Sequence, residues 1–270
     1  PDPTADCREQ CRLFRMTFQS GQGEPVPFLM AIPSWAPSPY PLVILVHGFF
    51  NNKAEYLYWQ APRLTRMGFA VLIPDLPFHG ERTGYPPMIT GLGDVHQFYR
   101  NICRCVIEVR ELMDVACQRT EFKTSNGILM GGYSLGAWIA SMAGASDSRV
   151  KALSLMVHGG TPHKAVDYDG DTEFQEILAD RIRLWQTYPE MDPEVVLPYF
   201  SPRPILMLNG TWDRLIPKNI AERTYQSARE PKQQIWYESG HMLPPQAYKE
   251  SALWLWGQWE FIQASLQRSE

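Results

Sequence analysis

The sequence lacks the features that would mark a membrane or nucleic-acid-binding protein. No apolar run reaches the roughly 18 residues needed to cross a bilayer, and the N-terminal stretch PDPTADCREQ has neither the basic start nor the apolar core of a signal peptide. There is no long run of Lys or Arg, and 25 basic against 29 acidic residues leave a formal charge of −4. We therefore expect a cytoplasmic protein with no nucleic-acid or membrane partner.

Cysteine is also scarce, with five residues in the chain. An odd number does not suit a disulfide framework, so we expect reduced thiols, with a local bridge between Cys7 and Cys11 as the alternative. Cys103 and Cys105 are two apart in a helical pattern and point in different directions. We therefore predict no metal site, and the sequence indicates no cofactor.

The composition is that of a globular protein. The 270 residues are 44% hydrophobic and 20% charged, which gives ample apolar surface for a core and no signature of disorder. The length fits one large α/β domain or at most two small ones. The chain is rich in aromatic residues and proline, with 9 Trp, 12 Tyr, 12 Phe and 23 Pro. These residues are compatible with a rigid apolar pocket, although they could equally belong to an ordinary core.

Short β-type runs alternate with longer helical patterns along the chain. Residues 12–18 and 26–32 flank the turn sequence SGQGE and predict an antiparallel hairpin. The unbroken aliphatic runs that follow are typical of buried parallel strands. We predict strands at 42–46, 70–73, 127–130, 153–157, 205–208 and 234–237, and helices at 53–67, 96–118, 135–144, 218–228 and 246–267. This order predicts an α/β fold with a mostly parallel central sheet and helices on both faces.

One segment interrupts the alternation. Residues 161–203 carry no strand pattern, and apolar residues recur within them at helical spacing. Insertions after a strand's carboxyl end often face the substrate in α/β folds, so we predict a helical lid, with an extra helical layer on the sheet as the alternative. The chain, 1–270, is then a single domain into which the lid is inserted.

The sequence GYSLG at 132–136 is the strongest local signal of chemistry. It follows the predicted strand 127–130 and precedes a helical pattern, which is the context of a G-x-S-x-G nucleophile elbow. So tight a turn leaves no room for side chains at Gly132 and Gly136. It would expose the hydroxyl of Ser134 above the sheet at a helix N-terminus, where developing negative charge is favoured.

A serine nucleophile needs a base, and the base needs an acid to orient it. Of six histidines, His241 is the last and follows the final strand pattern, which fits the chain order Ser, Asp, His of this architecture. Asp213 lies in the turn after strand 205–208 and so reaches the same edge of the sheet. The tetrahedral intermediate also needs two N–H donors, which we assign to Leu135, directly after Ser134, and to Phe49, in the loop after strand 42–46.

With these motifs the chain resembles the α/β-hydrolase superfamily, in particular bacterial serine esterases related to dienelactone hydrolases and to the catalytic domains of prolyl oligopeptidases. The matching sequences are HGF at 47–49, PDLPFHGERTG at 74–84, GGYSLG at 131–136, NGTWDRLIP at 209–217 and SGH at 239–241. Dienelactone hydrolases use a cysteine nucleophile where this chain has Ser134, and 270 residues leave no room for the peptidases' propeller domain. The resemblance implies an α/β-hydrolase fold and favours an esterase over a peptidase.

Further residues are expected at the same edge of the sheet. We expect His47 to hold the loop that carries Phe49, and Asp75 and Arg82 to form an ion pair that fixes the loop after strand 70–73. Buried histidines and aromatic side chains are common in cores as well as in pockets. The candidate substrate-binding residues are His158, Trp185, Tyr188 and Trp212.

Together these residues predict a metal-independent carboxylesterase for small to medium esters. Ser134 would attack the ester carbonyl, His241 would take and return the proton, and Asp213 would orient the imidazole. The alternatives are an amidase, small-peptide hydrolase or acyltransferase with the same triad, and a non-catalytic binding protein on a hydrolase fold. The sequence leaves the natural substrate and the oligomeric state open.

Overall fold

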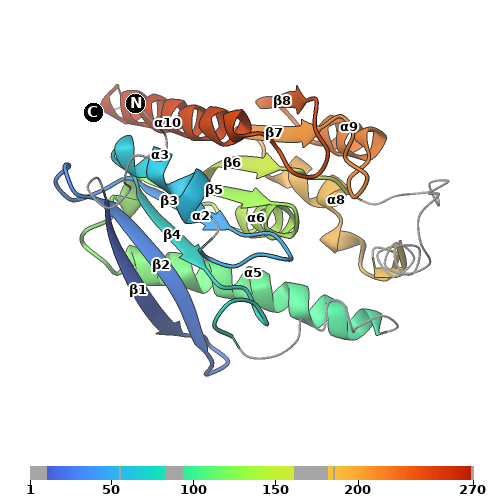
Figure 1. Ribbon diagram of the computed structural model, residues 1–270, viewed down its shortest axis with the longest axis horizontal. Helices are drawn as coiled ribbons and strands as arrows, with labels where there is room; N and C mark the ends of the chain where they lie inside the picture. Colours follow the sequence, from blue (N-terminus) through green and yellow to red (C-terminus); the bar gives the residue numbers. More distant parts are fainter. Residues whose placement is uncertain (1–10, 55, 83–93, 161–181, 185, 269–270) are drawn as a thin grey trace.

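A computed structural model describes residues 11–54, 56–82, 94–160, 182–184 and 186–268 (Figure 1). Within them, eight strands form one sheet in the order β1-β2-β4-β3-β5-β6-β7-β8. β1 (Cys11–Gln19) and β2 (Pro25–Pro33) form the predicted hairpin, and β2 pairs antiparallel with β4 (Ala70–Pro74). The other pairings are parallel and join β4, β3 (Leu42–Val46), β5 (Ile128–Tyr133), β6 (Val150–Met156), β7 (Ile205–Gly210) and β8 (Lys232–Tyr237). The predicted α/β fold class is confirmed.

Helices cover both faces of the sheet, as Figure 1 shows. α5 (Val95–Cys117) and α6 (Leu135–Ala145) pack on one face, and α3 (Ala61–Arg66) and α10 (Pro245–Gln267) pack on the other. All five residues of β3 are buried because alternate side chains of a strand point to opposite faces and both faces are covered. α9 (Lys218–Ser227) follows β7 and packs against it.

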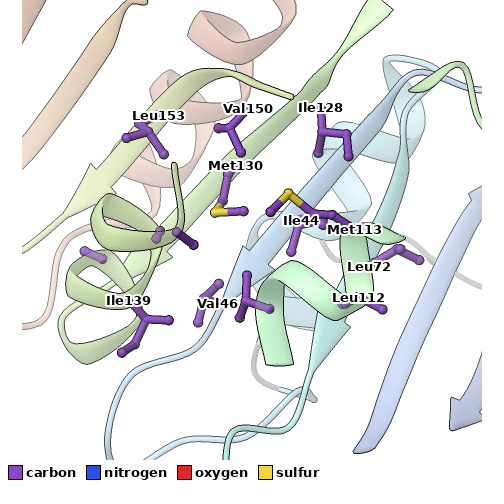
Figure 2. Close-up of a cluster of buried hydrophobic side chains, with 14 of the residues drawn as sticks. Ile44, Val46, Leu72, Leu112, Met113, Ile128, Met130, Ile139, Val150 and Leu153 are labelled. Atoms are coloured by element: carbon purple, nitrogen blue, oxygen red, sulfur yellow. The ribbon is translucent and has the colours of Figure 1, made fainter. Parts of the chain in front are cut away.

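Figure 2 shows the core that lies between the sheet and helices α5 and α6. Burying one large aliphatic side chain contributes about 1.5–3 kcal/mol, so this layer holds the central strands firmly against α5 and α6. The residues labelled there are Ile44, Val46, Leu72, Leu112, Met113, Ile128, Met130, Ile139, Val150 and Leu153, all fully or almost fully buried.

The predicted helix at 53–67 is divided in two. α2 (Tyr56–Trp59) ends before Gln60, and α3 starts at Ala61. Pro62 lies in the first turn of α3, where a missing N–H is harmless, whereas deeper in a helix it would interrupt the hydrogen-bond ladder. The apolar spacing continues across this break, which is why the pattern alone predicts one helix.

Part of the predicted insertion 161–203 lies outside the described residues, which resume at 182. The described part contains η2 (Pro189–Met191), α8 (Pro193–Val196) and η3 (Leu197–Tyr199). Four of its apolar side chains, Leu184, Met191, Leu197 and Phe200, are buried in the core cluster on the α5 and α6 face. This part of the insertion therefore packs on the core, and a lid formed by the insertion stays a prediction.

Two further features concern only the part of the chain that the structure describes. No helix there is long and apolar enough to cross a membrane, and no group of three or more His, Cys, Asp or Glu side chains there could hold a metal ion. Cys11 is the first residue of β1 rather than part of a helical turn, and Cys7 lies outside the described residues.

Candidate active site

Ser134 occupies the sharp turn between β5 and α6. Its backbone has φ 53° and ψ −115°, in the left-handed region that a non-glycine residue adopts only where its surroundings enforce it. A Cβ on Gly132 would lie 2.2 Å from the carbonyl oxygen of Gly136, and one on Gly136 would lie 1.9 Å from that of Val46. The Ser134 N–H donates to the Met156 carbonyl at 2.9 Å. Both glycines of the elbow are therefore required by the close approach of neighbouring backbone.

The loops after β7 and β8 bring two further side chains to this serine. His241 Nε2 lies 3.0 Å from Ser134 Oγ, and His241 Nδ1 lies 2.8 Å from Asp213 Oδ2. An ionised carboxylate only accepts hydrogen bonds, so Nδ1 carries the proton and Nε2 presents its lone pair to the serine hydroxyl. This is the tautomer that a general base requires. The structure thus brings together the three residues that the sequence suggested for a triad.

The carboxylate of Asp213 is fixed by the turn that carries it. Its Oδ1 accepts from the N–H groups of Leu215 at 2.8 Å and Ile216 at 3.0 Å. These two bonds leave Oδ2 for His241, whose side chain is 21% exposed while that of Asp213 is completely buried. The acid is therefore shielded from water, whereas the imidazole remains accessible from outside.

Tyr133, the last residue of β5, holds the histidine loop in place. Its hydroxyl donates to the main-chain carbonyl of His241 and accepts from the Leu243 N–H at 3.4 Å. Its ring meets the imidazole edge to face, with 5.9 Å between ring centroids. The residue next to Ser134 thus also positions the backbone of His241. Sequence reasoning assigned no role to this position, because only the fold brings it to His241.

The two predicted oxyanion donors border the elbow. Leu135 is the first residue of α6, where the N–H has no partner within the helix. The loop after β3 runs beside β5, and a Cβ on Gly48 would lie 3.3 Å from the carbonyl oxygen of Tyr133. This loop places Phe49, directly after Gly48, on the nucleophile's side of the sheet edge.

His47 holds the loop in the manner the sequence predicted. Its Nδ1 lies 2.8 Å from the Gly48 carbonyl oxygen, and its Nε2 accepts from the Leu76 N–H at 3.1 Å. Burial lowers the pKa of His47 to about 4, so the ring is neutral near pH 7, with its one proton on Nδ1. In a trans peptide the C=O and N–H point in opposite directions. By fixing the Gly48 carbonyl, His47 therefore also fixes the direction of the Phe49 N–H.

The loop after β4 is fixed by different ion pairs from the one predicted. Buried Asp75 pairs with buried Lys53, whose Nζ also lies 2.7 Å from Glu81 Oε1. Arg82 pairs with Glu108 of α5, and its contact with Asp75 is to the main-chain carbonyl, at 3.3 Å. The predicted pair of Asp75 and Arg82 side chains is wrong, because each finds its partner on an element distant in the sequence.

The four candidate substrate-binding residues lie in different environments. His158 follows β6 and is buried; burial lowers its pKa to about 3, and its Nε2 has no hydrogen-bond partner among the described residues. Tyr188 is half-buried and stacks on Tyr99, with 3.8 Å between ring centroids. Trp212 is 65% exposed, directly before Asp213, and Trp185 lies outside the described residues. Contact with substrate stays a prediction for all four.

Comparison with known proteins places the chain in a family. Residues 43–204 match the Alpha/beta hydrolase family, and the chain belongs to it. It is 26% identical over 223 residues to Esterase YjfP of Escherichia coli (strain K12), an overlap that covers 76% of this chain and 82% of the relative.

Solved structures share the same fold. TT1662 from Thermus thermophilus superposes with a TM-score of 0.70 at 24% identity, over 92% of this chain and 98% of the other. The acetyl xylan esterase from Paenibacillus sp. R4 superposes with a TM-score of 0.66 at 20% identity, over 97% and 86%. At these identities the likeness shows the fold alone.

Proposed function

We propose that the protein is a carboxylic ester hydrolase that works through an acyl-enzyme on Ser134. The observation that carries the proposal is the continuous line of hydrogen bonds from Asp213 through His241 to Ser134 Oγ, at 2.8 Å and 3.0 Å. A serine on a strained elbow, a base in the correct tautomer and a buried acid are the parts that acyl transfer requires. The similarity to a protein named as an esterase supports an ester as the substrate.

In the proposed reaction, His241 Nε2 takes the proton of Ser134 as Oγ attacks the ester carbonyl carbon. The carbonyl electrons move to oxygen, and the N–H groups of Phe49 and Leu135 stabilise the resulting oxyanion. Each such donor contributes roughly 3 kcal/mol in the transition state. The intermediate then collapses, and the imidazolium returns its proton to the departing alcohol. Water, activated by the same imidazole, hydrolyses the acyl-enzyme and regenerates Ser134.

Asp213 contributes by orientation and charge rather than by accepting a proton. Its Oδ2 keeps the His241 proton on Nδ1 and stabilises the imidazolium that forms when Nε2 is protonated. Complete burial of the carboxylate strengthens this interaction, because no water competes for Oδ2.

The proposal is tested with p-nitrophenyl esters from acetyl to lauroyl, extended to aryl and sugar esters. We expect a burst of p-nitrophenol equal to one per active chain with activated esters, and no burst from the Ser134→Ala variant. The rates of cleavage of an ester and an anilide with the same acyl group show which bond the protein prefers to cleave. Faster anilide cleavage would make the protein an amidase, and acyl transfer to added alcohols at the expense of hydrolysis would make it an acyltransferase. If no substrate in the panel shows Ser134-dependent turnover, the remaining alternative is a non-catalytic binding protein.

A further inference from the structure

Buried histidines hold both peptide units that flank Phe49. His47 holds the preceding unit through the Gly48 carbonyl. His79, in the loop after β4, holds the following unit, because its Nε2 lies 2.6 Å from the Phe49 carbonyl oxygen. The His79 ring also meets the Phe49 ring edge to face, with 5.7 Å between centroids. Fixing both planes fixes the two backbone dihedral angles of Phe49, and with them the direction of its N–H.

The two histidine rings are neighbours, with centroids 5.1 Å apart, but their partners differ in kind. His47 has one carbonyl oxygen and one N–H as partners, so a neutral ring satisfies both. His79 has two carbonyl oxygens: that of Pro77 lies 2.7 Å from Nδ1 and that of Phe49 lies 2.6 Å from Nε2. A carbonyl oxygen only accepts, so His79 makes both bonds only when both ring nitrogens carry a proton.

The bond to the Phe49 carbonyl is shielded from solvent. His79 is 5% exposed, so little water competes with the Phe49 carbonyl oxygen for Nε2.

The loop that carries His79 is itself anchored by ion pairs. The Asp75 carboxylate accepts from the Glu81 N–H at 3.0 Å and lies against Gly80, the residue after His79. Lys53 bridges Asp75 and Glu81. The titratable and charged groups of the elements packed here are Asp75, Glu81 and Arg82 in the loop itself, His47 and Lys53 in the loop after β3, Arg15 on β1, and Arg104 and Glu108 on α5.

We propose that His79 is a positioning residue of the oxyanion hole that ties the loop after β4 to the Phe49 carbonyl. The proposal rests on the proposed function, because it gives His79 a task only if the Phe49 N–H holds the oxyanion. Without the bond from Nε2, the Phe49 carbonyl is released and this part of the loop is held only through the Gly48 carbonyl, so the Phe49 N–H is positioned less firmly. Transition-state stabilisation then weakens while ground-state binding is almost unchanged, so kcat falls and KM does not.

The hydrogen bond is tested on the intact protein without reference to activity. Long-range ¹H–¹⁵N spectra of ¹⁵N-histidine-labelled protein distinguish protonated from unprotonated ring nitrogens, and the His79→Gln variant assigns the His79 signals. We expect a protonated Nε2 for His79 and an unprotonated Nε2 for its neighbour His47, which serves as the internal control. An unprotonated Nε2 on His79 would overturn the proposal.

The positioning role is tested by steady-state kinetics with p-nitrophenyl acetate. In His79→Gln we expect a 10- to 100-fold lower kcat and a KM within about twofold of wild type; removal of a whole oxyanion donor typically costs about 100- to 1,000-fold. Arg15→Gln is the matched control: it removes an exposed cation that pairs with Glu81 of the same loop, and should leave kcat unchanged.

Failure of this proposal and failure of the proposed function give different results. A wild-type kcat in His79→Gln overturns the positioning role, provided that wild-type turnover depends on Ser134. If Ser134→Ala is as active as wild type, the proposed function fails, and the ring-nitrogen spectrum still decides whether His79 Nε2 is protonated.

Discussion

The Asp213→Asn substitution tests how the triad fixes the tautomer of its base. The turn dictates how the new amide must lie. Two N–H groups, from Leu215 and Ile216, point at the Oδ1 position at 2.8 Å and 3.0 Å, so the amide oxygen has to occupy it. The amide NH2 then occupies the Oδ2 position and faces His241 Nδ1. A donor there forces Nδ1 to accept, which moves the ring proton to Nε2.

With its proton on Nε2, His241 donates to Ser134 Oγ and cannot accept the hydroxyl proton. In Ser-His-Asp hydrolases this change costs about 10⁴-fold in kcat, which corresponds to roughly 5 kcal/mol of transition-state stabilisation. The substituted side chain keeps its shape and both turn hydrogen bonds, so we expect the free energy of unfolding to change by no more than about 1 kcal/mol.

The assay for Asp213→Asn is kcat for p-nitrophenyl acetate, with urea unfolding as the control for folding. A folded variant that keeps kcat within tenfold of wild type would refute the argument, because the tautomer would then not be set by Asp213. A variant that loses kcat together with several kcal/mol of stability would show that the turn, rather than the tautomer, carries the effect.

Two further predictions concern residues around the triad. The Tyr133→Phe substitution keeps the ring but removes the hydrogen bonds to the His241 carbonyl and the Leu243 N–H. We therefore expect kcat to fall about tenfold with KM little changed. An unaltered kcat in stopped-flow assays would show that the hydroxyl does not position His241. In the folded protein the pKa of His158 is about 3, below its ordinary 6.5. As the pH falls, the unfolded chain is therefore protonated at this position first, and the free energy of unfolding decreases between pH 6.5 and pH 3. Between pH 7 and pH 5 the decrease is roughly 2 kcal/mol. In urea unfolding, His158→Gln should lose correspondingly less stability over this interval than wild type, and an equal loss in both proteins would contradict the prediction.

The sequence patterns predict most of the sheet because its strands are buried on both faces. The run at 42–46 coincides with β3, and the patterns at 96–118, 135–144, 218–228 and 246–267 agree with α5, α6, α9 and α10 to within a residue at each end. Strand ends are predicted less well: β6 starts at Val150 rather than at 153, and β5 extends to Tyr133. Glycine and polar residues at these ends interrupt the apolar run, although the backbone continues the ladder.

The candidate triad could be proposed from sequence because each member follows a strand in a fixed chain order. The groups that hold it could not, since they depend on contacts between elements far apart in the chain. Lys53 reaches Asp75 across 22 residues, and Tyr133 reaches His241 across 108. Nothing in the local sequence of His79 reveals that both its ring nitrogens face carbonyl oxygens. Patterns point to candidate reacting groups, whereas the fold determines what positions them.

The most direct test of the account is covalent labelling of the nucleophile. The protein is incubated with a fluorophosphonate and digested, and the modified peptide is identified by mass spectrometry. We expect one label per chain, on Ser134, because this hydroxyl lies against the His241 Nε2 lone pair, and no label in the Ser134→Ala variant. Labelling of another residue, or equal labelling of Ser134→Ala, would contradict the assignment of Ser134 as the nucleophile.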